Sequence, residues 1–124
     1  DYANLMYEFC ITPPDRIAPT LPYEWNSLEF YRAGRTCLLH YTDMPTQPWV
    51  SYNNRNAAVW YKTLKEAIAE DFISKSEIYR EVEHGHVSPD LPQHVGLAVH
   101  RNYEQLVQNY IAPYKRFLTI SKNS

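Results

Sequence analysis

Proline divides this 124-residue chain into two unlike parts. Six of its nine prolines lie before residue 57, where they interrupt long helices and strands, because proline fixes φ and has no backbone N–H to donate. One apolar run in that part, Cys37-Leu38-Leu39, predicts a buried strand, and Gly34 predicts the turn before it. A sheet needs three or more strands, or a covering layer of helices, to be stable. We therefore expect the partner strands of this sheet to lie outside the chain.

The part after residue 56 is predicted to be mainly helical. Residues 57–71 have the helical period, with Trp60, Leu64 and Ile68 on one apolar face and charged side chains away from it. Asn56 precedes the first helical residue, where asparagine commonly accepts a hydrogen bond from the first turn. One amphipathic helix is expected here.

Further helices are predicted on both sides of that one. A helix over residues 1–10 ends at a pair of prolines. Residues 74–77, Ser-Lys-Ser-Glu, have the sequence of a capping box and begin another helix, which ends near Gly85. Residues 86–97 are predicted to be a connector, and residues 102–111 a third carboxy-terminal helix.

Charge and hydropathy exclude two classes of partner. The formal net charge is −2, and no basic stripe offers a surface for nucleic acid. No run of about 18 apolar residues is present, so no membrane-spanning helix is expected. Cys10 and Cys37 do not have the Cys-x-x-Cys spacing of a zinc or redox pair, and both lie next to apolar residues. This context favours buried free thiols. The first residue is Asp1 and no signal peptide is visible, so we expect a piece of a larger protein, in either the cytoplasm or a secretory lumen.

The stretch His40–Trp49 is the strongest candidate for a functional site. The predicted strand ends at His40, and a loop rich in side-chain oxygen follows it up to Pro48 and Trp49. Neutral imidazole is a common metal ligand, and loops held by a strand often carry function. The stretch therefore suits a bound metal or phosphate, with a purely structural His-Tyr pair as the alternative.

A second group of candidate ligands lies near the predicted helix end at Gly85. Glu83, His84 and His86 cluster there, with His94 and His100 close in sequence, and they would hold a metal only if they converged in space. The alternative is that His84 and His86 are solvated residues that suit the negative end of a helix dipole. Glu24 and Glu29 are a weaker candidate pair of catalytic carboxylates, because nothing in the sequence fixes their separation.

Short pieces of the chain, taken in order, resemble the family-eight glycosyltransferases, the group that contains glycogenin and galactinol synthase. His40–Trp49 resembles their carboxy-terminal signature, in which a histidine and an aromatic residue precede a glycine, a lysine and Pro-Trp. Leu21-Pro22 followed by Asn26 resembles their Leu-Pro and asparagine ahead of that signature.

Two further pieces carry the same resemblance. Asp1, Leu5 and Phe9 resemble in spacing a family helix that begins with Asp-Gln. Residues 59–62, Val-Trp-Tyr-Lys, resemble the tryptophan-containing helix that follows Pro-Trp. The resemblance covers about residues 1–70, and the remainder of the chain takes no part in it.

The resemblance implies a fold and a reaction. The fold is α/β, with residues 1–70 as the carboxy-terminal part of a GT-A type nucleotide-sugar transferase domain and residues 71–124 as a helical extension. The reaction moves a sugar from a nucleotide-sugar donor, usually UDP-linked, to an acceptor, with retention at the anomeric carbon. A manganese ion bridges the donor diphosphate and is bound by His40 and by an Asp-x-Asp motif earlier in the family's chains. Manganese accepts imidazole, carboxylate and phosphate oxygen.

The resemblance also assigns roles to individual residues and partners. The expected partners are the nucleotide-sugar donor, an unidentified acceptor and the rest of the catalytic domain. The implied site residues are Thr42, Asp43 and Gln47 at the diphosphate, Asn26 and Trp49 at the acceptor or sugar, His40 at the metal, and Asp1 as the catalytic carboxylate.

Departures from the family pattern support a second hypothesis. Pro45 stands at the glycine position and has no N–H for a phosphate, and Gln47 stands at the lysine position without its charge. Tyr2 and Met6 replace the glutamine and asparagine of the first helix, and the chain has no Asp-x-Asp motif. The alternative is a non-catalytic member of the family that acts as a scaffold, with the tyrosine-rich residues 72–124 as its interaction surface.

Overall fold

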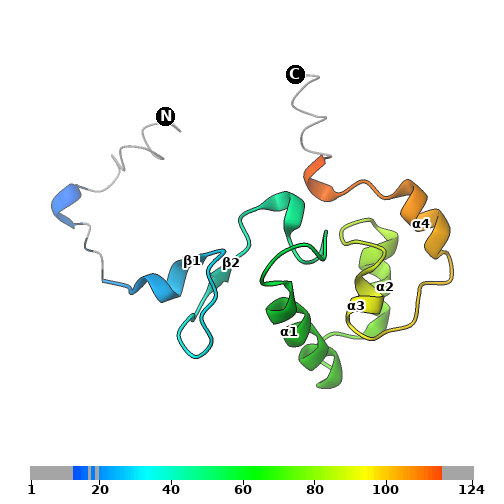
Figure 1. Ribbon diagram of the computed structural model, residues 1–124, viewed down its shortest axis with the longest axis horizontal. Helices are drawn as coiled ribbons and strands as arrows, with labels where there is room; N and C mark the ends of the chain where they lie inside the picture. Colours follow the sequence, from blue (N-terminus) through cyan, green and yellow to red (C-terminus); the bar gives the residue numbers. More distant parts are fainter. Residues whose placement is uncertain (1–12, 17, 19, 116–124) are drawn as a thin grey trace.

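A computed structural model describes residues 13–115 of the chain, except residues 17 and 19. A short parallel strand pair stands beside a group of helices (Figure 1). The elements in chain order are η2 (Pro14–Arg16), η3 (Tyr23–Asn26), β1 (Ser27–Leu28), β2 (Leu39–His40), η4 (Met44–Thr46), α1 (Ala57–Ala69), α2 (Lys75–Glu83), α3 (Leu91–His94) and α4 (Tyr103–Asn109), where η marks a 3₁₀ helix.

The predicted strand is present, but it is shorter and more exposed than expected. It covers only Leu39 and His40, and it pairs in parallel with β1. The prediction of a buried strand is wrong, because Leu38 is 49% exposed and Cys37 is an exposed free thiol. The described part of the chain has only these two strands and no layer that covers Leu38, so the apolar run has nothing to pack against. Gly34 forms the predicted turn, with φ +72°.

Helix α1 matches its prediction in position and in its apolar face. Leu64 is buried, and Trp60 and Ile68 pack against the same hydrophobic core. Asn56 precedes the helix but does not cap it, since its side-chain amide donates to the backbone carbonyl of Glu29 instead. The predicted cap is therefore wrong, because a partner from another segment takes the asparagine side chain.

Helix α2 begins with the predicted capping box. The Glu77 N–H donates to Ser74 Oγ at 3.2 Å, and the Ser74 N–H donates to Glu77 Oε2 at 2.8 Å. The helix ends before Gly85, whose φ of +68° is the left-handed conformation that glycine adopts without strain.

The predicted connector 86–97 contains a short helix, α3. Leu91 and Pro92 lie in its first turn and are both buried, and proline is tolerated there because the first-turn N–H groups have no partner within a helix. Leu91 and Val95 complete a core with Leu64 of α1 and Ile78 of α2. The main core therefore joins the three helices α1, α2 and α3.

The remaining predictions on the fold concern helix α4, the first ten residues, membrane-spanning helices and the fold class. Helix α4 ends at Asn109 because Tyr110 is extended, two residues earlier than expected. The helix predicted over residues 1–10 and Cys10 lie outside the described residues. The described helices are all too short or too polar to span a bilayer. The GT-A type α/β fold and the boundary at residue 70 stay predictions.

Candidate functional site

The two strands end at the same edge of the pair, because they run parallel. Leu28 pairs with His40 in the strand register, and the Glu29 N–H donates to the His40 carbonyl at 3.0 Å. Glu29 and Tyr41 are therefore the first residues beyond the carboxyl ends of β1 and β2. Loops at the carboxyl ends of parallel strands are the usual place for ligands in open α/β sheets.

The side chain of Glu29 gathers the hydrogen-bond donors of this edge. Its carboxylate accepts hydrogen bonds from the Asp43 N–H at 3.1 Å, from the N–H and hydroxyl of Thr42, and from the Asn54 amide at 3.1 Å. Burial raises the pKa of Glu29, but the hydrogen bonds from Asp43, Asn54 and Thr42 together lower it below its ordinary value of 4.5. The carboxylate is therefore held in its charged form. We call this arrangement of Thr42, Asp43 and Asn54 the oxyanion cradle.

The backbone of Glu29 is held as firmly as its side chain. Its carbonyl accepts hydrogen bonds from the Arg55 guanidinium and from the Asn56 amide, the latter at 2.8 Å. Its φ of +58° is unusual for a residue with a side chain. The Arg55 guanidinium also lies 4.6 Å from the centre of the Phe30 ring. Such a conformation persists only where surrounding contacts over-determine it, as these do.

The rest of the loop after β2 is held by its own contacts. The Gln47 amide donates to the Tyr41 carbonyl at 3.0 Å, and the Thr46 hydroxyl donates to the Asp43 carboxylate at 2.7 Å. Trp49 is half-buried, with the Tyr41 ring edge-on at 6.1 Å and the Trp60 ring at 5.8 Å. The loop therefore has a fixed shape that Trp49 attaches to helix α1.

Asn26 and His40 lie on neighbouring elements but face different surroundings. Asn26 lines a cavity of about 300 Å³ together with Tyr23, Phe30 and other residues of 23–36. His40 is exposed and is not among the residues that line that cavity. Asp1, the predicted catalytic residue, lies outside the described residues.

His40 supplies one suitable ligand for a metal, but it belongs to no group of three ligand residues in the part of the chain that the structure describes. The only group of three neighbouring His, Cys, Asp or Glu side chains among the described residues is Glu81, His84 and His86, far along the chain. An exposed imidazole suits Mn²⁺ in type. A manganese ion on His40 would therefore need its carboxylate ligands from beyond the described residues.

The resemblance pointed to Thr42 and Asp43 of the cradle, but no motif in the sequence pointed to Asn54. Glu29 was only a weak candidate for a carboxylate pair, and Asn54 was assigned no role. The available signal was the density of side-chain donors in Asn53-Asn54-Arg55-Asn56, just before a helix. Such donors need an acceptor. In the structure the acceptor of the Asn54 amide is Glu29, which lies 25 residues earlier in the chain.

Other residues from the sequence analysis have structural partners instead. The imidazole of His94 stacks on the Tyr61 ring at 5.2 Å. His100 is buried, and its Nε2 lies 3.0 Å from a Glu83 carboxylate oxygen. Comparison of the chain with protein-family models, with curated proteins and with solved structures found no match, so the site is interpreted from its own geometry.

Proposed function

We propose that this chain is part of a metal-dependent, retaining glycosyltransferase and that it binds the diphosphate of a nucleotide-sugar donor at the carboxyl edge of β1 and β2. In keeping with the resemblance, the donor is a UDP-sugar. The observation that carries the proposal is the oxyanion cradle. Backbone N–H groups of Thr42 and Asp43 and the amide of Asn54 converge on one carboxylate, Glu29. Convergent backbone N–H groups are also the usual ligands of phosphate oxygens.

The neighbouring residues suit the other parts of such a donor. His40 is exposed at the end of β2, one residue before the loop, and offers an imidazole to a divalent cation. A bound Mn²⁺ would neutralise the charge that develops on the leaving diphosphate. Asn26 lines a cavity with the exposed rings of Tyr23 and Phe30, and such rings suit stacking against a sugar or acceptor.

The proposal includes the rest of the catalytic domain as a partner. Many large apolar side chains of the amino-terminal part are solvent-exposed, and large exposed apolar patches mark sites of interaction with a partner. Among the described residues before residue 45, eight large apolar residues are more than two fifths exposed: Leu21, Tyr23, Trp25, Leu28, Phe30, Tyr31, Leu38 and Met44. Partner strands would bury this surface and complete the sheet.

A second candidate function, a non-catalytic scaffold, has its own supporting observation. The donors that a diphosphate needs are already used within the chain, since Glu29 occupies the cradle and the Gln47 amide donates to the Tyr41 carbonyl. A diphosphate would have to displace a carboxylate of like charge. Pro45 adds no donor, and Gln47 adds no positive charge.

Binding of UDP to the full-length protein that contains this chain tests the first proposal. We expect Mn²⁺-dependent binding by titration calorimetry, and we expect His40→Ala to weaken it by about tenfold or more, because a metal ligand is lost. His86→Ala removes another exposed histidine, so it is the matched control and should bind UDP like the wild type. Equal binding by wild type and His40→Ala would exclude this site.

The scaffold is tested by the same preparation in a different assay. Turnover of a nucleotide sugar, detected as released UDP, would exclude the scaffold. Absence of both UDP binding and turnover, with a folded protein by circular dichroism, would exclude the transferase and leave the scaffold.

A further inference from the structure

The end of helix α2 has a geometry that brings two specific side chains together. The Gly85 N–H donates to the Val82 carbonyl and the His86 N–H donates to the Glu81 carbonyl, both at 3.0 Å. With the left-handed φ of Gly85, these two hydrogen bonds define a Schellman motif. In this motif the third residue before the cap and the second after it are neighbours. Here those residues are Glu81 and His86.

An unusual pair of residue types occupies the two neighbouring positions. A hydrophobic contact frequently accompanies a Schellman motif at these positions. This chain instead has a carboxylate and an imidazole, and His86 Nδ1 lies 2.7 Å from Glu81 Oε2. The turn at Gly85 therefore serves to bring two potential metal ligands together.

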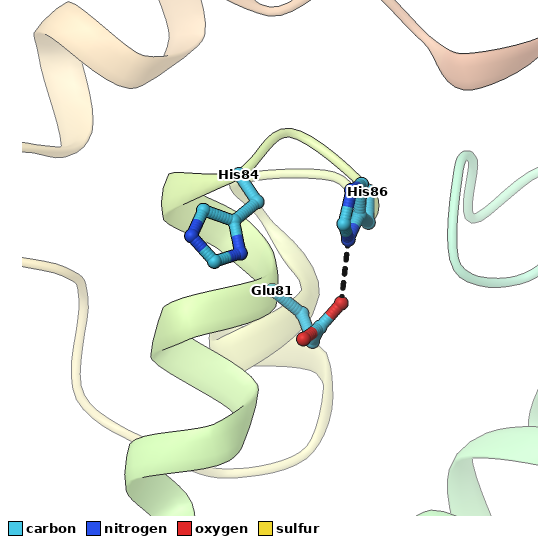
Figure 2. A group of neighbouring side chains, drawn as sticks. All are labelled: Glu81, His84 and His86. Carbon is cyan, nitrogen blue, oxygen red and sulfur yellow. Dashed lines mark hydrogen bonds and ion pairs between the residues drawn. The ribbon is translucent and has the colours of Figure 1, made fainter.

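His84 is the third member of the cluster. It follows Glu81 by three residues, and side chains three apart lie on the same face of a helix. Figure 2 shows the His84 ring and the Glu81 carboxylate on one side of the helix end, with His86 reaching toward Glu81 from the turn. The two imidazole rings lie 5.5 Å apart between their centres. The cluster thus combines a helical spacing with a turn.

The ligand atoms of the cluster are near enough for modest side-chain rotations to bring them onto one ion. One ligand atom from each residue lies within 4.8 Å of the others. In a tetrahedral zinc site with bonds of about 2.1 Å, the ligand atoms are about 3.4 Å apart. The side chains of His86 and Glu81 are 59% and 39% exposed, so small rotations are open to them and an ion can reach them from solvent.

We propose that Glu81, His84 and His86 form a zinc site with a fourth position open to water. Two imidazoles and one carboxylate are a common ligand set for Zn²⁺, whereas Mn²⁺ prefers mostly oxygen ligands. The metal takes the place of the proton between His86 Nδ1 and Glu81 Oε2, and the neutral imidazole then carries its one N–H proton on Nε2. The carboxyl end of a helix carries partial negative charge, which stabilises a cation there.

The positive charge of Arg80 lies beside only one of the two carboxylate oxygens of Glu81, so the other oxygen can bind the metal. Arg80 Nε lies 3.8 Å from Glu81 Oε1, the oxygen that His86 does not contact. Oε2 is therefore the metal ligand, and Oε1 stays beside the guanidinium. The site is independent of the proposed transferase function, since none of its residues belongs to the oxyanion cradle.

Zinc binding to the 124-residue chain tests the proposal. We expect titration calorimetry with ZnCl₂ to give one site per chain, and Co²⁺ to give the visible absorption bands of a tetrahedral complex. We expect His84→Ala, His86→Ala and Glu81→Gln each to weaken Zn²⁺ binding by about tenfold or more, because each removes one of three ligands. Glu70→Gln removes an exposed carboxylate at the end of α1, so it is the matched control for Glu81→Gln and should bind Zn²⁺ like the wild type.

Two measurements keep the outcome clear if a variant folds poorly. Circular dichroism reports whether α2 persists in each variant. In the wild type, Zn²⁺ should shift the ring resonances of His84 and His86 in NMR spectra and leave those of His94 unchanged. Zinc affinity that is the same in His84→Ala and His86→Ala as in the wild type would overturn the proposal, as would ring shifts confined to other histidines.

Discussion

The carboxylate of Glu29 accepts a hydrogen bond from the backbone N–H of Asp43 at 3.1 Å, and this contact ties the end of β1 to the loop that follows β2. The two residues are 14 positions apart in the chain. The shape of the candidate site therefore depends on a side chain from the neighbouring strand. This dependence leads to the first prediction.

Replacement of Glu29 by alanine should release the loop from the strand pair. The free energy of unfolding should fall by about 2 kcal/mol, the net contribution of one charge-assisted hydrogen bond. The loss is no larger because water replaces the carboxylate as the acceptor for the donors that stay exposed. Glu29→Gln should have a smaller effect, since its amide oxygen still accepts hydrogen bonds but carries no charge. Chemical denaturation measures both.

A matched glutamate provides the control for this prediction. Glu70 is exposed at the end of α1, and Glu70→Ala should change the free energy of unfolding by less than about 0.5 kcal/mol. Amide hydrogen exchange at Thr42 and Asp43 should speed up in Glu29→Ala only. Unchanged exchange at both amides would show that Glu29 does not hold the loop.

The core between α1, α2 and α3 predicts a large effect at Leu91. This side chain is 2% exposed and packs with Leu64, Ile78 and Val95. Leu91→Ala should lower the free energy of unfolding by about 2–5 kcal/mol, because it leaves a cavity. Phe72→Ala removes a larger side chain that is 84% exposed, and it should cost less than about 0.5 kcal/mol. Thermal unfolding compares the two variants.

The capping box predicts a pH dependence for helix α2. Hydrogen bonds from the Ser74 backbone and side chain hold the pKa of Glu77 below its ordinary value of 4.5. A lowered pKa in the folded state means that the contribution to stability is complete above pH 4.5 and is lost as the pH falls through the folded value. The difference in stability between wild type and Glu77→Gln should therefore shrink as the pH falls from 6 to below 4. A difference that grows toward low pH would contradict this assignment.

Two helix ends with the same geometry predict opposite responses to substitution. Helix α1 also ends in a Schellman motif, with the Phe72 N–H donating to the Ala67 carbonyl and Asp71 in the left-handed conformation at φ +55°. Asp71→Gly should raise the free energy of unfolding by about 0.5 kcal/mol by removing strain. Gly85→Ala should lower it by about 1 kcal/mol for the same reason.

Gly85→Ala also connects this prediction to the proposed zinc site. The substitution strains the turn that brings His86 to Glu81, so zinc binding should weaken along with stability. Asp71→Gly, in the same motif but far from any zinc ligand, should leave zinc binding unchanged. Calorimetric titration of both variants with ZnCl₂ makes the comparison.

The sequence could have identified the zinc cluster more closely than it did. Glu83 is next to His84 in the sequence and was grouped with His84 and His86, but its carboxylate pairs with the buried His100 instead. Glu81 is three positions before His84, a spacing that puts two side chains on one helix face, whereas Glu83 is next to His84 and does not face it. The helical period therefore contained the information, provided that the turn at Gly85 was also considered.

What the sequence determined by itself is the local structure of the helical half and the position of His40 at a strand end. Helix α1, the capping box at Ser74 and the stop at Gly85 depend on residues within about one helical turn of each other, so a short stretch of sequence specifies them. Only the tertiary structure decided the exposure of Cys37 and the convergence of Thr42, Asp43 and Asn54 on Glu29. Those contacts join segments up to 25 residues apart, and which donors meet which acceptor depends on how the folded segments approach one another.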